Sequence, residues 1–247
     1  MKKVVLVTGS AKGIGKEVIL EFAKNNYDCV INYNTSKKEA LSLKEEVEKY
    51  GVKCLAIKAD ISSESDVDKM FGEIEEKMGG VDILVNNAGV DFSNLFQKQT
   101  TEEFQRTFDV NVLGAYITAK RAYKHMIDNK WGKVINIAST NGINSYYPVC
   151  MAYDASKAAL ISLTHNLSVQ FAPFVNVNAV APGFIGTEEE LKGYDDAFLK
   201  EECDKILLKR YGKASEVAKL VYFLASEDAS FINNTVIRID GGQYGAN

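Results

Sequence analysis

The chain has 247 residues, of which 46% are hydrophobic and 25% charged, and its formal net charge is −4. This composition is ordinary for a globular protein with a large core, and the negative charge argues against nucleic acid as the main partner. Four scattered cysteines and two histidines offer no common zinc-ligand spacing, so we predict no metal site. The first apolar run covers only residues 4–7, and no other run is long enough to span a membrane. We therefore expect a cytoplasmic protein with reduced thiols.

Short apolar segments alternate with longer helical patterns along the whole chain. The apolar segments predict strands at 4–8, 29–33, 54–59, 81–86, 133–138, 175–180 and 235–240. Most are almost continuously apolar, which is typical of parallel strands covered on both faces. Capping boxes open three helical segments, where Ser36 pairs with Glu39, Thr100 with Glu103 and Thr187 with Glu190. The alternation predicts a single α/β domain with a doubly wound sheet, which binds ligands at the carboxyl ends of its strands.

The segment TGSAKGIG, residues 8–15, directly follows the first predicted strand and opens the first helix. Its glycines, Gly9, Gly13 and Gly15, allow a tight turn and let the backbone approach a pyrophosphate. The helix N-terminus adds N–H groups and the positive end of the helix dipole. Such turns also occur without a ligand, but the position after the first strand favours a dinucleotide site. No Gly-Lys-Ser/Thr ends the run, which excludes a Walker-type loop.

The end of the second predicted strand bears on which dinucleotide binds. A site for NAD usually has a carboxylate there, which accepts hydrogen bonds from the ribose hydroxyls. Tyr33 and Asn34 stand at about that position, so no carboxylate would repel a 2′-phosphate. Lys12 and Lys37 could supply positive charge, although both could equally be solvated surface residues. We therefore predict that NADP(H) is preferred, with NAD(H) as the alternative.

Tyr153 and Lys157 lie in the small-residue segment YDASKAAL, residues 153–160. Residues four apart share one face of a helix, so the phenol and the ammonium point to the same place. An ordinary amphipathic helix with a half-buried tyrosine and a solvated lysine would show the same spacing. The interpretation of this pair therefore depends on the rest of the chain.

Further short motifs occur in a definite order. They are TGSAKGIG (8–15), AD (59–60), NNAG (86–89), DVNVLGAY (109–116), INIAS (135–139), YDASK (153–157), APGFIGT (181–187) and DGG (240–242). Each is weak alone, but together and in this order they make the chain resemble a classical short-chain dehydrogenase/reductase from end to end. The resemblance implies one Rossmann domain over residues 1–247 with a mostly parallel seven-stranded sheet. It also implies an oxidoreductase that transfers hydride between nicotinamide and a ketone or secondary alcohol.

The resemblance assigns a role to each matching residue. Four would be catalytic, namely Asn111, Ser139, Tyr153 and Lys157. The cofactor would be bound by Gly9, Ser10, Lys12, Gly13, Ile14, Gly15, Tyr33, Asn34, Asp60, Ile61, Asn87, Ala88, Gly89, Tyr153, Lys157, Pro182, Gly183, Ile185 and Thr187. Asp60 would bond the adenine amino group, and the residues from Pro182 to Thr187 would surround the nicotinamide.

These roles give the tyrosine–lysine pair a chemical reason. Tyr153 would exchange a proton with the substrate oxygen, while Lys157 would hold the nicotinamide ribose and lower the pKa of the tyrosine. A proton donor works best when its pKa is near the working pH. Ser139 would hydrogen-bond the substrate oxygen. Asn111 would distort its helix and hold a water that connects Lys157 to solvent.

Within the family, APGFIGT and LKRYGKASEVA (208–218) look most like bacterial 3-oxoacyl-[acyl-carrier-protein] reductases. Such an enzyme reduces a β-keto thioester and docks an acidic acyl carrier protein through basic residues. Here residues 168–178 contain no basic residue, Lys130 and Lys133 are the only cations of the other docking segment, and Asn234 replaces a usual glycine. A sugar, polyol or hydroxysteroid dehydrogenase is therefore an alternative, and a nucleotide-sensing regulator without activity is a more distant one.

The resemblance also implies a homotetramer. The predicted helices around 100–128 and over 153–171 carry apolar residues on more than one face, including Ala115, Ile117, Ala119, Leu160, Leu163 and Leu167. We expect one face to pack on the sheet and the other on a neighbouring subunit, unless both are buried within one chain. Residues 241–247 would add a second contact. Tyr146 and Tyr147 are candidates to line the substrate entrance.

Overall fold

The computed structural model describes residues 2–143 and 147–243. Within these ranges, seven strands form one sheet in the order β3-β2-β1-β4-β5-β6-β7, and every pairing is parallel. The strands are β1 Val4–Val7, β2 Asp28–Tyr33, β3 Cys54–Lys58, β4 Ile83–Asn86, β5 Gly132–Ile137, β6 Val175–Pro182 and β7 Val236–Ile239. The predicted α/β class and all seven predicted strands are therefore confirmed, with small differences at their ends.

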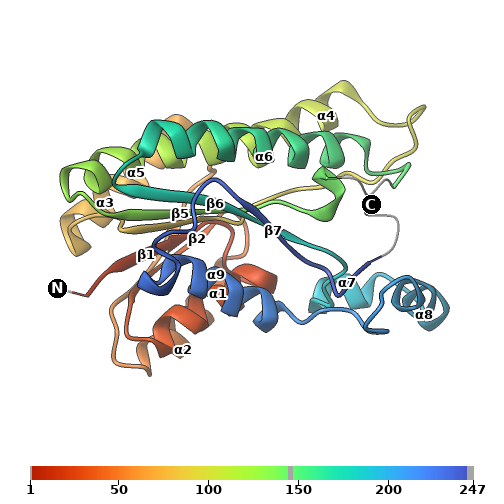
Figure 1. The fold of residues 1–247 in the computed structure, drawn as a ribbon, viewed down its shortest axis with the longest axis horizontal. Helices are drawn as coiled ribbons and strands as arrows, with labels where there is room; N and C mark the ends of the chain where they lie inside the picture. Colours follow the sequence, from red (N-terminus) through yellow and green to blue (C-terminus); the bar gives the residue numbers. More distant parts are fainter. Residues whose placement is uncertain (1, 144–146, 244–247) are drawn as a thin grey trace.

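Helices cover both faces of the sheet (Figure 1). They are α1 Gly13–Lys24, α2 Lys37–Glu48, α3 Glu64–Met78, α4 Thr101–Phe108, α5 Gly114–Asp128, α6 Met151–Phe171, α7 Glu188–Lys192, α8 Asp196–Asp204 and α9 Ala214–Ala225. The short segments are the π-helical η1 Asp109–Leu113 and the 3-10 turns η2 Thr140–Gly142 and η3 Glu227–Ala229. No helix in the described ranges is both long and apolar enough to cross a lipid bilayer.

The core has two halves because neighbouring residues of a strand point to opposite faces of the sheet. In β1, Val5 and Val7 belong to the half that includes the buried faces of α1, α2 and α9. Val4 and Leu6 belong to the other half, which includes residues of α3, α5 and α6. Strands that supply side chains to both halves must be apolar at every position, which is why the sequence pattern revealed them.

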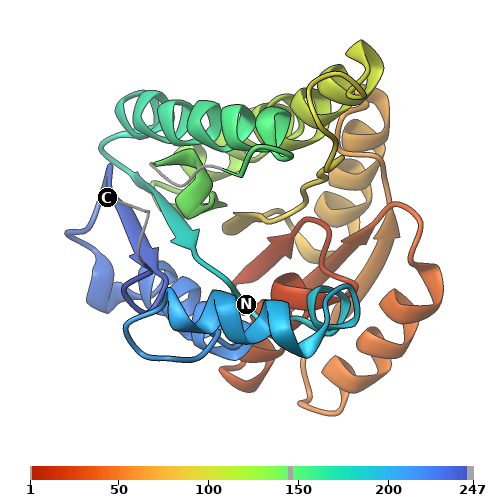
Figure 2. The same ribbon diagram turned by 90° about the vertical axis from the view of Figure 1, so that its right-hand side faces the viewer.

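The strand order reverses next to β1, which pairs with β2 on one side and β4 on the other. The loops after β1 and β4 meet there, and Gly9 makes the close approach possible. Its φ is +60°, and a Cβ at this position would lie 2.8 Å from the Cα of Ala88. A side chain would therefore be strained and would push the two loops apart. In Figure 2 the helices α7 and α8 lie in front of this end of the sheet.

The apolar residues noted on the two long predicted helices belong mostly to the core of the single chain. Five of the six, Ala115, Ile117, Ala119, Leu160 and Leu167, are buried within the chain, and Leu163 packs against the same core half as α3 and α5. Helical periodicity does not say which apolar stripe faces the sheet. The structure shows that these residues form the stripe on the sheet side, and the contact with a neighbouring subunit stays a prediction. Among the described residues, the exposed large apolar side chains of η1, α5 and α6 are Leu113, Tyr116, Tyr123, Met151 and Val169.

Candidate active site

Two adjoining cavities lie at the carboxyl ends of the strands. The larger has a volume of about 740 Å³ and the smaller about 350 Å³. Asn87, Gly89 and Val90, which follow β4, line both of them. The two cavities therefore form one elongated site across the point where the strand order reverses, where doubly wound sheets bind their ligands.

The smaller cavity contains residues that follow β1, β2, β3 and β4. Among the predicted cofactor residues, its lining includes Gly9, Lys12, Tyr33, Asn34, Asp60, Ile61, Asn87, Ala88 and Gly89. Asn87 holds the loops together, because its side-chain Nδ2 donates to the carbonyls of Thr8 at 2.9 Å and Gly9 at 3.1 Å. The Thr8 hydroxyl in turn accepts the backbone N–H groups of Asn87 and Ala88, each at 3.0 Å.

Three of the predicted cofactor residues line neither cavity, namely Ser10, Gly13 and Gly15. The hydroxyl of Ser10 is buried and donates to the carbonyl of Val7 at 2.8 Å, so it stabilises the turn. A Cβ at Gly15 would lie 2.6 Å from the Nδ2 atom of Asn87, so this glycine lets α1 pass beside the loop after β4. These residues shape the glycine-rich turn between β1 and α1, which we call the glycine cradle. A turn of this kind at a helix N-terminus fits the pyrophosphate of a dinucleotide.

Asp60, after β3, is held by two neighbours. Its carboxylate accepts hydrogen bonds from the Ser62 hydroxyl at 2.7 Å and from the Arg106 guanidinium at 2.7 Å. Burial alone would raise the pKa of Asp60, but the bonds from Ser62 and Arg106 outweigh burial and hold it below its ordinary value. Arg106 also lines the smaller cavity, which the sequence did not predict. The Arg106–Asp60 ion pair joins α4 to the wall of the smaller cavity.

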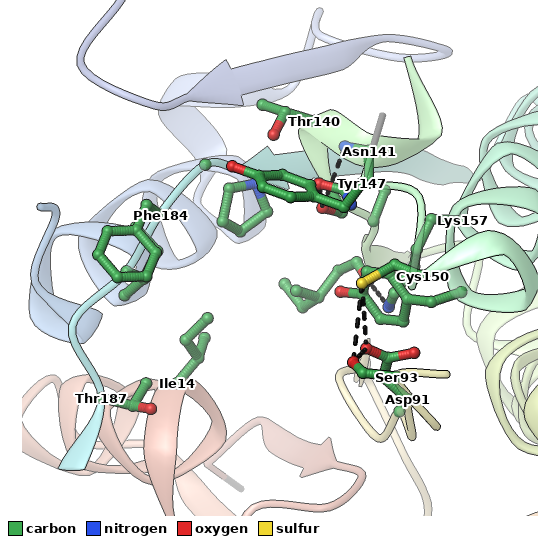
Figure 3. A pocket seen from close by; sticks show the side chains of 18 of the residues that line it. Ile14, Asp91, Ser93, Thr140, Asn141, Tyr147, Cys150, Lys157, Phe184 and Thr187 are labelled. Atoms are coloured by element: carbon green, nitrogen blue, oxygen red, sulfur yellow. Dashed lines mark hydrogen bonds between the residues drawn. The ribbon is translucent and has the colours of Figure 1, made fainter. Parts of the chain in front are cut away.

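The larger cavity contains the remaining predicted residues apart from Asn111. Its lining includes Ile14, Ser139, Tyr153, Lys157, Pro182, Gly183, Ile185 and Thr187. Figure 3 shows Lys157 and Tyr147 among the side chains that surround it. Tyr147 was predicted at the entrance and does line the cavity, whereas Tyr146 lies outside the described residues.

Lys157 is buried beside Tyr153 on the same face of α6. It is 3% exposed, and its Nζ atom donates to the carbonyl of Ile137 at 2.7 Å. The same atom lies 5.4 Å from the centre of the Tyr153 ring. Burial lowers the pKa of Lys157 to about 8. The predicted convergence of phenol and ammonium is therefore confirmed, and the lysine is not a solvated surface residue.

Asn111 lies in the π-helical segment η1, between α4 and α5. Its side chain accepts the N–H of Val90 at 2.8 Å and donates to the carbonyl of Val90 at 3.0 Å and the Ser156 hydroxyl at 2.9 Å. These bonds join η1 to the loop after β4 and to α6. A π-bulge of this kind often marks a functional site. The predicted helix distortion at Asn111 is confirmed, while its role in holding water stays a prediction.

Ser139 follows β5 by two residues and faces the larger cavity. Its hydroxyl accepts the backbone N–H of Asn141 at 3.2 Å, which fixes the oxygen at the start of η2. Gly89 approaches the same region from the other side. A Cβ there would meet the Oδ1 atom of Asn111 at 3.4 Å and the Nζ atom of Lys157 at 3.5 Å. Four segments that are distant in sequence thus meet around Lys157, namely the loop after β4, η1, the end of β5 and α6.

Several polar residues of the larger cavity were not predicted from the sequence. They are Asp91, Ser93, Thr140, Asn141, Glu202 and Gln243. Asp91 could have been predicted, because it follows the motif NNAG closely at the end of a strand. No local sequence pattern connects Glu202 or Gln243 to the site. Of the two cations noted in the docking segment, one lies inside the protein. Lys133 is buried in β5 and its Nζ atom donates to the side chain of Asn176 at 2.7 Å, so it is not available to a partner.

Comparison with known proteins agrees with this geometry. The family model described as "Enoyl-(Acyl carrier protein) reductase" matches residues 9–243. A 3-oxoacyl-[acyl-carrier-protein] reductase of Staphylococcus epidermidis is 35% identical over 99% of this chain and 100% of its own length. Glucose 1-dehydrogenase 2 of Bacillus subtilis is 34% identical over 97% of this chain and 94% of its own.

A solved structure gives the same result in three dimensions. The structure of ElxO with NADP bound superposes with a TM-score of 0.89 at 38% identity, and the match covers 98% of both chains. The relatives differ in the substrates that their names state, but they share one fold over the full length of the chain. From the parallel sheet, the glycine cradle and the Tyr153–Lys157 pair, together with these relatives, it follows that the chain belongs to the short-chain dehydrogenase/reductase family and is an oxidoreductase.

Proposed function

We propose that the protein reduces a ketone to a secondary alcohol with NADPH, and that the reaction takes place in the larger cavity. The cofactor is NADP(H), as in the bound structure of ElxO. The residues that line the smaller cavity would hold the adenosine half, and Tyr33 and Asn34 at the end of β2 would bring no carboxylate to it. When bound, the cofactor supplies the hydride, and the protein supplies position and charge.

The observation that carries this proposal is the buried ammonium of Lys157 next to the Tyr153 phenol. A positive charge favours the phenolate, so it makes Tyr153 a better proton donor near neutral pH. Ser139 donates a hydrogen bond to the substrate oxygen and orients it towards Tyr153. Asn111 positions η1 and the loop after β4. It also holds a water that connects Lys157 to solvent.

Replacement of Tyr153 by Phe tests the assignment. This change removes the proton donor and keeps the ring, so we expect kcat to fall by at least about 10²-fold while the fold and NADPH binding persist. The measurement is NADPH oxidation with a panel of ketones, with Tyr50→Phe as the control, because Tyr50 is exposed just after α2 and lies outside the proposed interface. A Tyr153→Phe enzyme within threefold of the parent would overturn the assignment. A parent protein that binds NADPH but reduces no ketone would instead be a regulator.

The first candidate substrate is a 3-oxoacyl group on acyl carrier protein, as in the name of the Staphylococcus epidermidis relative. Docking of an acidic carrier has less support, because Lys133 is buried and only Lys130 of the two predicted cations is exposed. The second candidate is a sugar, polyol or hydroxysteroid. A specific observation favours it, since the buried carboxylate of Glu202 lines the larger cavity. Turnover of acetoacetyl thioesters compared with hydroxylated ketones distinguishes the two.

We also propose that the protein works in the cytoplasm as a homotetramer. The exposed apolar residues Leu113, Tyr116, Tyr123 and Val169 lie on η1, α5 and α6, and they support an interface on this layer. The part of the predicted second contact that covers residues 244–247 lies outside the described residues.

A further inference from the structure

Glu202 places a buried carboxylate in the wall of the larger cavity. It belongs to α8, is 2% exposed and lines the cavity together with Tyr147 and Gln243. These three residues come from distant parts of the chain, namely α8, the segment after η2 and the segment after β7. A carboxylate is costly to bury, so its surroundings must supply hydrogen bonds.

Two neighbours satisfy part of that requirement. The Tyr147 hydroxyl donates to Oε2 of Glu202 at 2.9 Å, and the Lys205 ammonium donates to Oε1 at 2.6 Å. Lys205 therefore compensates the negative charge of Glu202 from outside the cavity lining. A carboxylate has about four acceptor positions, so these two bonds leave acceptor capacity on a residue that lines the cavity.

Tyr147 remains a neutral phenol in this arrangement. Burial and the bond to Glu202 raise its pKa to about 12, so it keeps its proton and donates it to the carboxylate. The phenolic oxygen then acts as an acceptor, and the Gln243 side-chain N–H reaches it at 3.4 Å. The other side-chain atom of Gln243, Oε1, accepts the backbone N–H of Phe184 at 3.2 Å, which fixes the amide. The wall thus presents acceptors in a defined orientation.

A second carboxylate lies at the exposed part of the cavity. Oδ2 of Asp91 accepts from the Ser93 hydroxyl at 2.7 Å and from the Cys150 thiol at 3.4 Å, a group visible in Figure 3. Among the described residues that line the cavity, Lys157 is the single lysine or arginine, and it serves the cofactor side. Lys205 balances the charge of Glu202, so it is Asp91 that gives the exposed part of the cavity a negative charge, and this charge disfavours a substrate that carries a carboxylate or a phosphate.

We propose that Glu202 and Tyr147 bind a hydroxyl group of a neutral ketone substrate, so that the larger cavity selects hydroxyketones over plain acyl chains and keto acids. This inference rests on the proposed ketone reductase function and names the substrate class for it. A hydroxyl can donate a hydrogen bond to the Glu202 carboxylate or to the phenolic oxygen of Tyr147, whereas an alkyl chain would cover both acceptors without a hydrogen bond. A cationic amine is less suitable, because Lys205 already balances the charge.

The test is a set of matched ketones with NADPH. Each hydroxyketone, with its hydroxyl one to three carbons from the carbonyl, is compared with the alkyl ketone of the same length, the keto acid and the aminoketone. For the preferred hydroxyl position we expect kcat/KM to exceed that of the alkyl ketone by roughly 10–100-fold, the range for a hydrogen bond to a charged group. The acetoacetyl thioester and the keto acid should also have a lower kcat/KM than the hydroxyketone.

We expect this preference to fall by at least about tenfold in Glu202→Gln and in Tyr147→Phe. The fall should come mainly from a higher KM for the hydroxyketone, while kcat/KM for the alkyl ketone changes little. Glu201→Gln is the matched control. Glu201 is on the same helix and also pairs with Lys205, at 3.1 Å, but it does not line the cavity. A thermal unfolding curve for each variant shows whether it is folded. If Glu202→Gln does not fold, Tyr147→Phe still tests the proposal.

The outcomes separate the two proposals. If no ketone is reduced, the proposed function and this inference both fail. If alkyl ketones, thioesters or keto acids are reduced as well as hydroxyketones, the enzyme is a reductase and the Glu202 subsite is refuted. Preference for the aminoketone, or an equal effect of Glu201→Gln, also refutes it, because the wall would then act through charge alone.

Discussion

Lys157 keeps a positive charge in a buried position, and the cost is visible in its pKa of about 8. The native state therefore binds fewer protons than the unfolded chain between pH 8 and the ordinary lysine pKa of about 10.4. The unfavourable contribution of this group to stability is fully present below pH 8 and decreases as the pH rises. Burial is thus tolerated because the ammonium has a use at the site.

The same titration should appear in cofactor binding. We expect the Kd for NADPH to increase above about pH 8, because the ammonium that would hold the nicotinamide ribose is lost as Lys157 deprotonates. Fluorescence titrations between pH 7 and 9.5 measure this. Lys157→Met should bind more weakly and without the inflection near pH 8. A parent protein whose affinity is constant over this range would contradict the role of Lys157.

Individual residues differ in how far the sequence reveals them. The convergence of Tyr153 and Lys157 could be predicted because helical geometry brings positions four apart to one face. Their expected roles came from the ordered motifs in the rest of the chain. Glu202 and Tyr147 are 55 residues apart and meet only in the folded chain. Arg106 was missed for the same reason, since its ion pair with Asp60 joins α4 to the end of β3. Contacts of this kind depend on the packing of elements and leave no local pattern.

At the level of elements, the clearest predictions were those with a local physical cause. Strands were recognised because both faces are buried, and the capping box at Thr100 is present, with Thr100 and Glu103 exchanging hydrogen bonds of 3.0 and 3.1 Å. The box predicted at Ser36 is wrong. The helix does begin at Lys37, but the Ser36 side chain makes no capping bond. The side chain of Glu190, needed for the third box, lies outside the described residues.

We expect the cofactor preference to depend on the segment that joins β1 to α1 and on the end of β2. Lys12 precedes α1 and lines the smaller cavity with Tyr33 and Asn34. We expect NADPH to bind more tightly than NADH, and Lys12→Ala to reduce that preference by roughly tenfold or more, as expected for a charge-assisted bond to phosphate. Fluorescence titration with both cofactors measures the ratio, with the solvent-exposed Lys49→Ala as the control. Tighter binding of NADH by the parent would show that the end of β2 has been misread.

At the level of the whole molecule, the apolar surface of the α5–α6 layer bears on assembly. Tyr116 is 45% exposed and Val169 is 69% exposed, and both lie on the outer side of the layer that covers the sheet. Apolar groups in such positions often mark contacts between subunits. A single sequence shows that these helices are rich in apolar residues, but the sheet must be in place before the outward ones can be identified.

We expect light scattering to give about four times the chain mass of 27.3 kDa at micromolar concentration. The double change Tyr116→Glu with Val169→Glu should produce smaller species that stay folded, because charges on the outer face oppose burial at an interface. Tyr50→Glu is the control, since Tyr50 is exposed at the end of α2 on the opposite face of the sheet. A stable monomer for the parent chain would exclude the tetramer.

The shared lining of the two cavities has a kinetic consequence. Asn87, Gly89 and Val90 belong to both, so a ligand already in the larger cavity would obstruct the nicotinamide half of the cofactor if it has to reach Tyr153. We therefore expect a compulsory order, with NADPH first on and NADP⁺ last off. Product inhibition measures this order. NADP⁺ should compete with NADPH, whereas the alcohol should inhibit non-competitively against NADPH, and an alcohol that competes with NADPH would indicate random addition.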